Sequence, residues 1–93
     1  MKRRPYTIIV AKRVREKAEA FFETHEELIP RFQQLIREIR LTPYEGAGHP
    51  HPLTRESRHI NCWSRRLDKK HRLVYNVIDS ARNIFIVHVG EHY

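Results

Sequence analysis

The spacing of the apolar residues changes halfway along this chain, and the change limits the folds that it can adopt. From Val14 to Ile39, apolar residues recur every three or four positions, which is the period of an α-helix with one buried face. After Cys62, short β-branched and aromatic runs alternate apolar with polar residues, as strands do. A chain of 93 residues can bury one modest core and no second one. We therefore expect a single α+β domain over residues 1–93.

The helical part divides in the middle and predicts a hairpin over residues 11–40. The motif Thr-His-Glu-Glu interrupts the periodic pattern at Thr24, and Glu27 three residues later predicts a capping box at the start of the second helix. Pro30 lies beyond the first turn that this start implies. The second helix therefore either begins near Ile29 or is kinked.

The strand candidates flank the hairpin and determine the predicted topology. One is "YTIIVA" from Tyr6, and three more, "CWSRRL", "RLVYNVI" and "NIFIVHV", follow one another with short turns between them. Three consecutive strands with short turns form an antiparallel meander. The element order β-α-α-β-β-β therefore predicts a two-helix hairpin packed on one face of a mainly antiparallel four-stranded sheet, with the other face open.

The stretch between the hairpin and the meander is expected to be a loop. Residues 42–52 hold two glycines and three prolines, and a polar stretch continues to Asn61. A connection of this length without regular structure is unusual in a compact domain and is often functional.

The charge of the chain indicates a polyanionic partner. The formal net charge is +7, and residues 54–72 hold seven basic residues against two acidic ones. Nucleic acid and an anionic membrane surface are the two classes of partner that such a charge fits. No apolar run is long enough to span a membrane or to form a signal-peptide core, and the single cysteine cannot form an internal disulfide. We expect a cytoplasmic protein.

The strand pattern places one arginine and the end of the chain near each other. Arg72 lies in an otherwise apolar strand, and arginine is rarely buried without a partner, so its side chain is expected on the open face. If the last strand pairs beside this one, it delivers His92 and Tyr93 near that face.

The seven histidines differ in what they can do. His25 and His59 are expected at the surface, and His71 and His88 in structural positions in or beside strands. His49 and His51 form a His-x-His pair, which could bind a metal. Two nitrogens with no cysteine or well-placed carboxylate make a weak site, so we expect no metal.

Imidazoles, arginines and a tyrosine in a basic cleft suit metal-free RNA cleavage. The 2′-OH of the RNA attacks the adjacent phosphorus, so the protein supplies only a base, an acid and a cation. Histidine can perform either proton transfer near neutral pH. From the residue types alone, simple nucleic-acid binding is the favoured interpretation, and RNA cleavage is the alternative.

Three segments, "TPYEGAGHPHPL", "WSRRLDKKHRLVY" and the terminal "HY", resemble the YoeB branch of the RelE superfamily, the toxins of bacterial toxin–antitoxin pairs. The resemblance implies a RelE-like fold and ribosome-dependent cleavage of mRNA in the decoding A site, without metal or cofactor. It also implies neutralisation by a cognate antitoxin, which we expect to be acidic and encoded next door. The other expected partners are mRNA and the ribosome, with a homodimer as a further option.

The resemblance assigns roles to individual residues. Arg72 matches the catalytic arginine that contacts the phosphate and the transition state, His92 matches the general acid, and Tyr93 matches the terminal tyrosine that orients RNA. Arg65 and Arg66 match paired arginines that contribute to phosphate binding.

The chain departs from the family pattern at the expected base. The family segment commonly reads Lys-Pro-Glu-Pro-Leu, with the glutamate as proposed base, whereas this chain reads "HPHPL". His51 therefore stands in for the glutamate and is assigned as the base, and His49 replaces the lysine near the phosphate. Asn61 replaces a frequent glycine and tolerates a similar backbone geometry. Glu45 matches a glutamate with a structural role.

Two other interpretations remain open. Loss of the glutamate could leave a weakly active or inactive homologue that binds RNA or the ribosome and acts mainly as an antitoxin partner or regulator. A metal-binding regulator using His49 and His51 is the third interpretation. His51 could also do no more than pack the rigid loop between Pro50 and Pro52.

Overall fold

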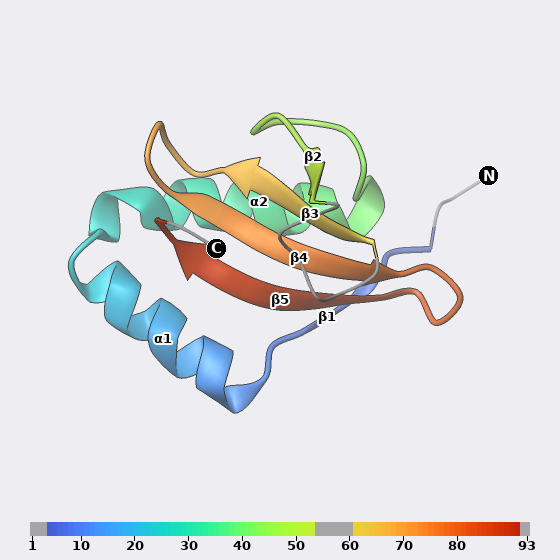
Figure 1. The fold of residues 1–93 in the computed structure, drawn as a ribbon, viewed down its shortest axis with the longest axis horizontal. Coiled ribbons are helices and arrows are strands. Elements are labelled where there is room, and N and C mark those ends of the chain that lie inside the picture. Colours follow the sequence, from blue (N-terminus) through green and yellow to red (C-terminus); the bar gives the residue numbers. More distant parts are fainter. Residues whose placement is uncertain (1–3, 54–60, 92–93) are drawn as a thin grey trace.

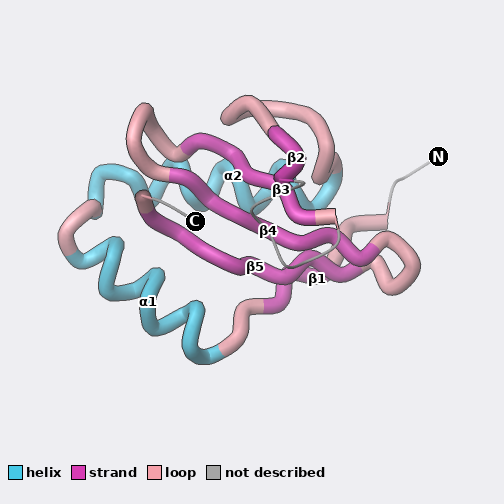
Figure 2. The backbone as a smooth tube through the Cα atoms, in the orientation of Figure 1, coloured by secondary structure: helices cyan, strands magenta, loops and turns pink. Residues whose placement is uncertain are grey.

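A computed structural model of the protein describes residues 4–53 and 61–91. Its elements run along the chain as β1 (Thr7–Ile9), α1 (Lys12–Glu23), the 3₁₀-helix η1 (Glu26–Leu28), α2 (Ile29–Leu41), β2 (His51–Leu53), β3 (Cys62–Arg66), β4 (Arg72–Ile78) and β5 (Asn83–Gly90). Figure 1 shows the two helices and the sheet, and Figure 2 separates helices, strands and loops by colour.

The strands form one sheet in the order β1-β5-β4-β3-β2. β1 pairs with β5 in parallel, and every other neighbouring pair is antiparallel. The predicted α+β class and the mainly antiparallel sheet are confirmed. The predicted strand count of four is wrong, because His51–Leu53 adds a fifth strand inside the expected loop. Pro52 argued against a strand, but β2 lies at the edge of the sheet, where a missing N–H is tolerated.

The core lies between the sheet and the helices. Leu73, Tyr75 and Val77 alternate along β4 toward the helices, and all three are buried. From the other side α2 buries Leu35 and Ile39 completely, whereas α1 buries no residue fully and packs beside β5. Both helices therefore contribute to the same core, and α1 closes its margin (Figure 1).

The junction between the two helices differs from the predicted capping box. Thr24 ends α1, and its hydroxyl donates to the Phe21 carbonyl oxygen at 3.2 Å. No side chain caps η1 or α2, because the short 3₁₀-turn leads directly into α2. Pro30 lies in the first turn of α2, which confirms the alternative that this helix begins at Ile29.

A buried arginine attaches the loop after α2 to the sheet. The Arg65 side chain on β3 is 0% exposed. Its guanidinium donates to five acceptors: the Tyr75 hydroxyl (3.1 Å), Glu38 Oε1 (3.3 Å) and the carbonyl oxygens of Thr42 (2.5 Å), Glu45 (2.8 Å) and Ala47 (3.3 Å). A guanidinium has five N–H donors, so its hydrogen-bonding capacity is used within the protein. We call this arrangement the Arg65 clamp.

The Arg65 clamp corrects the expectation that Arg65 binds phosphate. Alternation along β3 turns Arg65 toward the core, together with the flanking Trp63 and Leu67. Its charge is met by the Glu38 carboxylate and by backbone carbonyls, and none of the guanidinium is exposed to solvent. Arg65 therefore holds the loop, and phosphate cannot reach it in this conformation.

The loop then approaches β3 closely at Gly48. The Arg66 amide donates to the Gly48 carbonyl oxygen at 2.7 Å. Gly48 has φ of +85°, and a Cβ there would lie only 3.0 Å from the Arg66 carbonyl oxygen. Only glycine fits this contact without strain. The next residues, His49 to His51, therefore start directly beside the end of β3.

Replacing the clamp arginine should destabilise the fold strongly. Arg65→Ala removes five hydrogen bonds, which Arg65 donates to Glu38, to the Tyr75 hydroxyl and to three carbonyl oxygens. We expect the free energy of unfolding to fall by about 3–5 kcal/mol. Arg37→Ala, at an exposed position on α2, serves as the control and should change it by less than about 0.5 kcal/mol. Urea unfolding measures both. A similar loss of unfolding free energy in the two variants would show that the Arg65 clamp does not stabilise the fold.

The clamp should also make stability depend on pH through Glu38. The pKa of the Glu38 carboxyl lies below its ordinary value, mainly because Oε1 accepts the Ala47 amide proton. Partial burial raises this pKa, and Gln34 and Arg65 lower it further. A lowered folded-state pKa stabilises the fold above the unfolded pKa, and this contribution is lost as the pH falls through the folded-state pKa.

Glu38→Gln keeps the shape of the side chain and removes this titration. The difference in unfolding free energy between wild type and Glu38→Gln should therefore shrink as the pH is lowered from about 6 to about 3. Urea titrations across that range measure it. A difference that stays constant with pH would mean that the carboxylate charge contributes nothing.

Candidate active site

A small basic cavity lies on the sheet face opposite the helices, at the end of β3 and the start of β4. It has a volume of about 370 Å³ and is lined by His49, Pro50, His51, Arg66 and Arg72. Four residues that the sequence assigned to the site, two histidines and two arginines, therefore lie together. They come from the loop, β2, β3 and β4.

The register of the sheet explains this grouping. His51 pairs with Ser64 across β2 and β3, and Arg66 pairs with Arg72 across β3 and β4. Directly paired residues project to the same face, and so do residues two apart on one strand. His51, Arg66 and Arg72 therefore project on the same side, and all three are exposed.

The two arginines lie directly opposite each other on β3 and β4 and form a cationic pair. Among the residues that the structure describes, no carboxylate forms an ion pair with Arg66 or Arg72. Like charges directly opposite one another in a sheet repel. An anion that entered the cavity could receive hydrogen bonds from both guanidinium groups, which suits a phosphate.

The last strand leads toward this cavity. Gly90 at the end of β5 pairs with Arg72 at the start of β4, which confirms that β5 lies beside β4 and ends near the arginine pair. His92 and Tyr93 follow two and three residues later, outside the described residues, so their assigned roles stay predictions.

Three other residues that the sequence analysis singled out, Asn61, Glu45 and Arg65, have structural roles around the site. Asn61 has φ of +60°, which confirms that asparagine adopts a conformation usual for glycine here. Glu45 contributes its backbone carbonyl to the Arg65 clamp. The partners of Arg65 were missed, although one signal pointed to its burial: Arg65 alternates in phase with the apolar Trp63 and Leu67.

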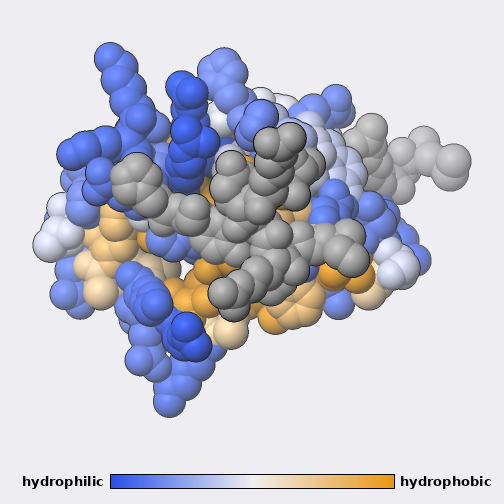
Figure 3. All heavy atoms as spheres, in the orientation of Figure 1, coloured by the Kyte–Doolittle hydropathy of each residue, from blue (hydrophilic) through white to orange (hydrophobic). Residues whose placement is uncertain are grey.

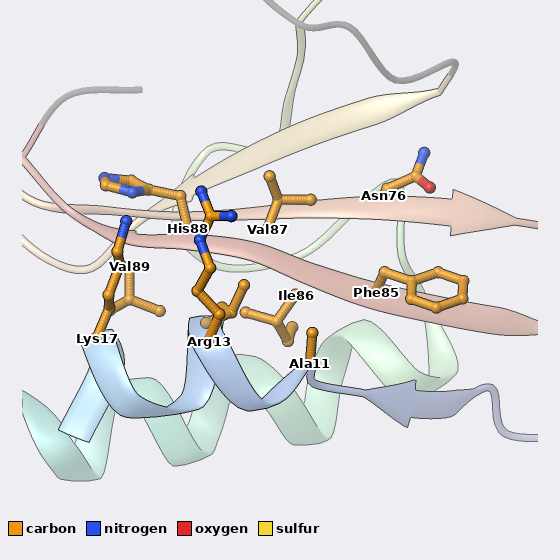
Figure 4. Close-up of a pocket in the computed structure, with 10 residues that line it drawn as sticks. Ala11, Arg13, Lys17, Asn76, Phe85, Ile86, Val87, His88 and Val89 are labelled. Carbon is orange, nitrogen blue, oxygen red and sulfur yellow. The ribbon is translucent and has the colours of Figure 1, made fainter.

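A larger cavity, of about 790 Å³, lies between α1 and β5 (Figure 4). Its lining is mostly apolar and includes Val14, Phe85 and Val87, while Arg13 and Lys17 extend from α1 toward β5. Burial lowers the pKa of the neighbouring His88, and the charge of Lys17 adds to this. We call this cavity the α1–β5 groove.

Two further features of the described residues concern metal binding and membrane insertion. Within residues 4–53 and 61–91, no three His, Cys, Asp or Glu side chains are grouped so that they could hold a metal ion. None of the described helices is long and apolar enough to cross a membrane.

Comparison with known proteins identifies relatives by sequence. The family model for the "YoeB-like toxin of bacterial type II toxin-antitoxin system" matches residues 12–93. Toxin YoeB of Escherichia coli strain K12 is 41% identical over 59 residues, which cover 63% of this chain and 68% of that protein. Toxin YoeB of Synechocystis is 36% identical over 73 residues, which cover 78% of this chain and 80% of that protein.

Solved structures agree with the sequence relatives. The YoeB/ParE toxin from Agrobacterium tumefaciens superposes with a TM-score of 0.79 at 27% identity, covering 94% of this chain and 99% of that one. A YoeB dimer from Staphylococcus aureus gives a TM-score of 0.76 at 29% identity, covering 96% of this chain and 99% of that one. These matches confirm the resemblance found in the three sequence segments, and the chain belongs to the YoeB-like toxins of bacterial type II toxin–antitoxin systems.

Proposed function

We propose that this toxin is a metal-free endoribonuclease that cleaves mRNA in the ribosomal A site. The observation that carries the proposal is the grouping of His51, Arg66 and Arg72 around one small cavity. These groups supply a proton acceptor and two fixed cations, which are most of what cleavage by the RNA's own 2′-OH requires. Membership of the YoeB-like family supports the same activity.

Each residue has one step in the proposed reaction. His51 Nδ1 or Nε2 accepts the proton of the 2′-OH, and the 2′-oxygen attacks the adjacent phosphorus. Arg72, with Arg66 beside it, stabilises the negative charge that develops on the phosphorane oxygens. The P–O5′ bond then breaks, and His92 donates a proton to the leaving 5′-oxygen. The products carry a 2′,3′-cyclic phosphate and a 5′-OH.

Two further residues have supporting roles in the proposal. Tyr93 orients the RNA at the end of the chain, and His49, on the cavity wall, contacts the phosphate backbone. Ribosomes and mRNA are the proposed partners in the reaction, which would take place in the cytoplasm.

A neutralising antitoxin is the proposed protein partner. The related toxin from Staphylococcus aureus was solved as a YoeB-YefM complex, with a TM-score of 0.74 at 28% identity, covering 95% of this chain and 98% of that one. In this chain the α1–β5 groove offers apolar surface beside Arg13 and Lys17, and Figure 3 shows apolar side chains in orange between α1 and the strands. Such a groove fits an acidic segment with apolar side chains. A homodimer, as solved for the Staphylococcus aureus relative, is also proposed.

Substituting the two loop histidines separately tests the assignment of the base. His51→Ala should slow mRNA cleavage in a reconstituted translation reaction by about 100-fold or more, and should remove the acidic limb of the pH–rate profile. His49→Ala is the matched control, because it removes an imidazole from the same cavity, and it should cost less than about 10-fold.

Restoring the family's glutamate gives an independent check on the base. His51→Glu should recover activity and move the acidic limb to lower pH, since a free glutamate titrates near ~4.3 and a free histidine near ~6.5. If His51→Ala cleaves at the wild-type rate with an unchanged profile, His51 only packs the loop. Wild-type protein that binds ribosomes without cleaving mRNA would favour the inactive homologue.

A further inference from the structure

The paired arginines of the cavity need something to hold them together. Arg66 ends β3 and Arg72 begins β4, so the turn 67–71 is all that joins them along the chain. Because the two guanidinium groups repel each other and no described carboxylate is paired with either, a loose turn would let them separate. The β3–β4 register pairs their backbones, but this is the last pair before the turn, so the anchoring of the turn affects where the two side chains point.

Asp68 closes the turn from within. Its Oδ1 accepts hydrogen bonds from the backbone amides of Lys70 (2.8 Å) and His71 (2.7 Å), and the Leu67 amide donates to the His71 carbonyl oxygen at 2.8 Å. The His71 ring also bonds to this carboxylate, with Nδ1 3.0 Å from Oδ1. A carboxylate only accepts, so Nδ1 of His71 carries the proton.

The His71 ring in turn attaches the turn to the end of α1. Its side chain is 12% exposed. It meets the Phe21 ring edge-on at 5.1 Å between centroids and the His25 ring at 4.7 Å. His25 stacks on Phe21 at 4.2 Å with an interplanar angle of 9°. Two rings at the end of α1 and one ring from the turn before β4 therefore form one cluster, which we call the ring anchor.

His25 is itself held in place, although the sequence suggested an ordinary surface residue. Its Nδ1 donates to the Phe21 carbonyl oxygen at 2.9 Å, and the Thr24 hydroxyl lies 3.0 Å from the same nitrogen. The ring is thus fixed to the last turn of α1. The ring anchor connects a rigid helix end to the residue that directly precedes Arg72.

We propose that His71 is a positioning residue for the arginine pair, acting through the ring anchor formed with Phe21 and His25. The side chain of His71 is held on the helix side of the sheet, while its neighbour Arg72 faces the cavity. Fixing His71 fixes the start of β4, and so the direction of Arg72 and its distance from Arg66. The inference rests on the proposed cleavage for its rate measurements, and its other measurements do not need that activity.

Two neighbouring phenylalanines provide a matched test. Phe21 belongs to the ring anchor and meets the His71 ring. Phe22 meets neither histidine in a ring contact: it lies edge-on to Phe21 at 5.2 Å and packs against Phe32 of α2, with centroids 4.9 Å apart. Phe21→Leu and Phe22→Leu remove the same number of atoms from adjacent half-buried positions on α1. Rates are measured at a temperature at which both variants are fully folded. Phe21→Leu should lower the kcat for mRNA cleavage at least several-fold more than Phe22→Leu does. The two variants should nevertheless have similar unfolding midpoints.

The central residue is tested directly by deletion and rescue of its ring. His71→Ala should lower kcat by about 10-fold to 100-fold, because a small displacement of a catalytic cation costs rate out of proportion to stability. His71→Phe keeps a ring against Phe21 and His25, and should recover most of that loss. Amide hydrogen exchange at Leu67 and Lys70 should be faster in His71→Ala and close to wild type in His71→Phe.

The outcomes separate this inference from the proposed function. Wild-type protein that does not cleave mRNA would contradict the proposed function, and the same variants would then be compared by binding of a short single-stranded RNA, where His71→Ala should bind more weakly than His71→Phe. The positioning role is wrong if rate or binding follows stability equally in both phenylalanine variants. It is also wrong if His71→Ala leaves the exchange of the turn amides unchanged.

Discussion

The arrangement of this molecule depends on the hydrogen bonds that the buried guanidinium of Arg65 donates. A charge that is fully excluded from solvent is tolerated only when hydrogen bonds and a counter-charge replace the water. Here the acceptors come from α2, from β4 and from the loop after α2, so a single side chain fixes the loop to the sheet. The loop passes tightly over β3 at Gly48 and then supplies His49 and His51 to the basic cavity. The shape of the cavity therefore depends on a buried arginine that does not line it.

Arg65 and Arg66 are neighbours in sequence and have opposite environments. Strand alternation turns Arg65 into the core and Arg66 to the opposite face, where its side chain is exposed at the basic cavity. The buried arginine exhausts its donors on the protein, while the exposed one can still donate to a ligand. The turn that follows, closed by Asp68 and attached by His71 to α1, sets Arg72 against Arg66. Structural side chains on the helix side of the sheet therefore organise the arginine pair on the other side.

Periodicity was enough to predict the hairpin and the three C-terminal strands, because their apolar faces are continuous along the chain. It was not enough for β2, since three residues containing Pro52 form a strand only because β3 offers an edge. The grouping of His51, Arg66 and Arg72 was predictable from the family motif and the alternation on β4. Alternation on β3 signals the burial of Arg65 but not its partners, which include Glu38 and backbone carbonyls of the loop. The ring anchor likewise joins Phe21 to His71. Such long-range pairs leave no local pattern in a single sequence.

The central claim is that this arrangement supports cleavage by the RNA's own 2′-OH. Protein side chains transfer the protons and stabilise the negative charge on the phosphorane oxygens. The chemistry of the cut ends tests it most directly. Purified toxin is added to ribosomes translating a defined mRNA, and the ends at the cleavage site are identified by ligation and mass spectrometry. The account predicts a 2′,3′-cyclic phosphate, or the 3′-phosphate it hydrolyses to, on one fragment and a 5′-OH on the other. A 3′-OH with a 5′-phosphate, which results from attack by water, would contradict it.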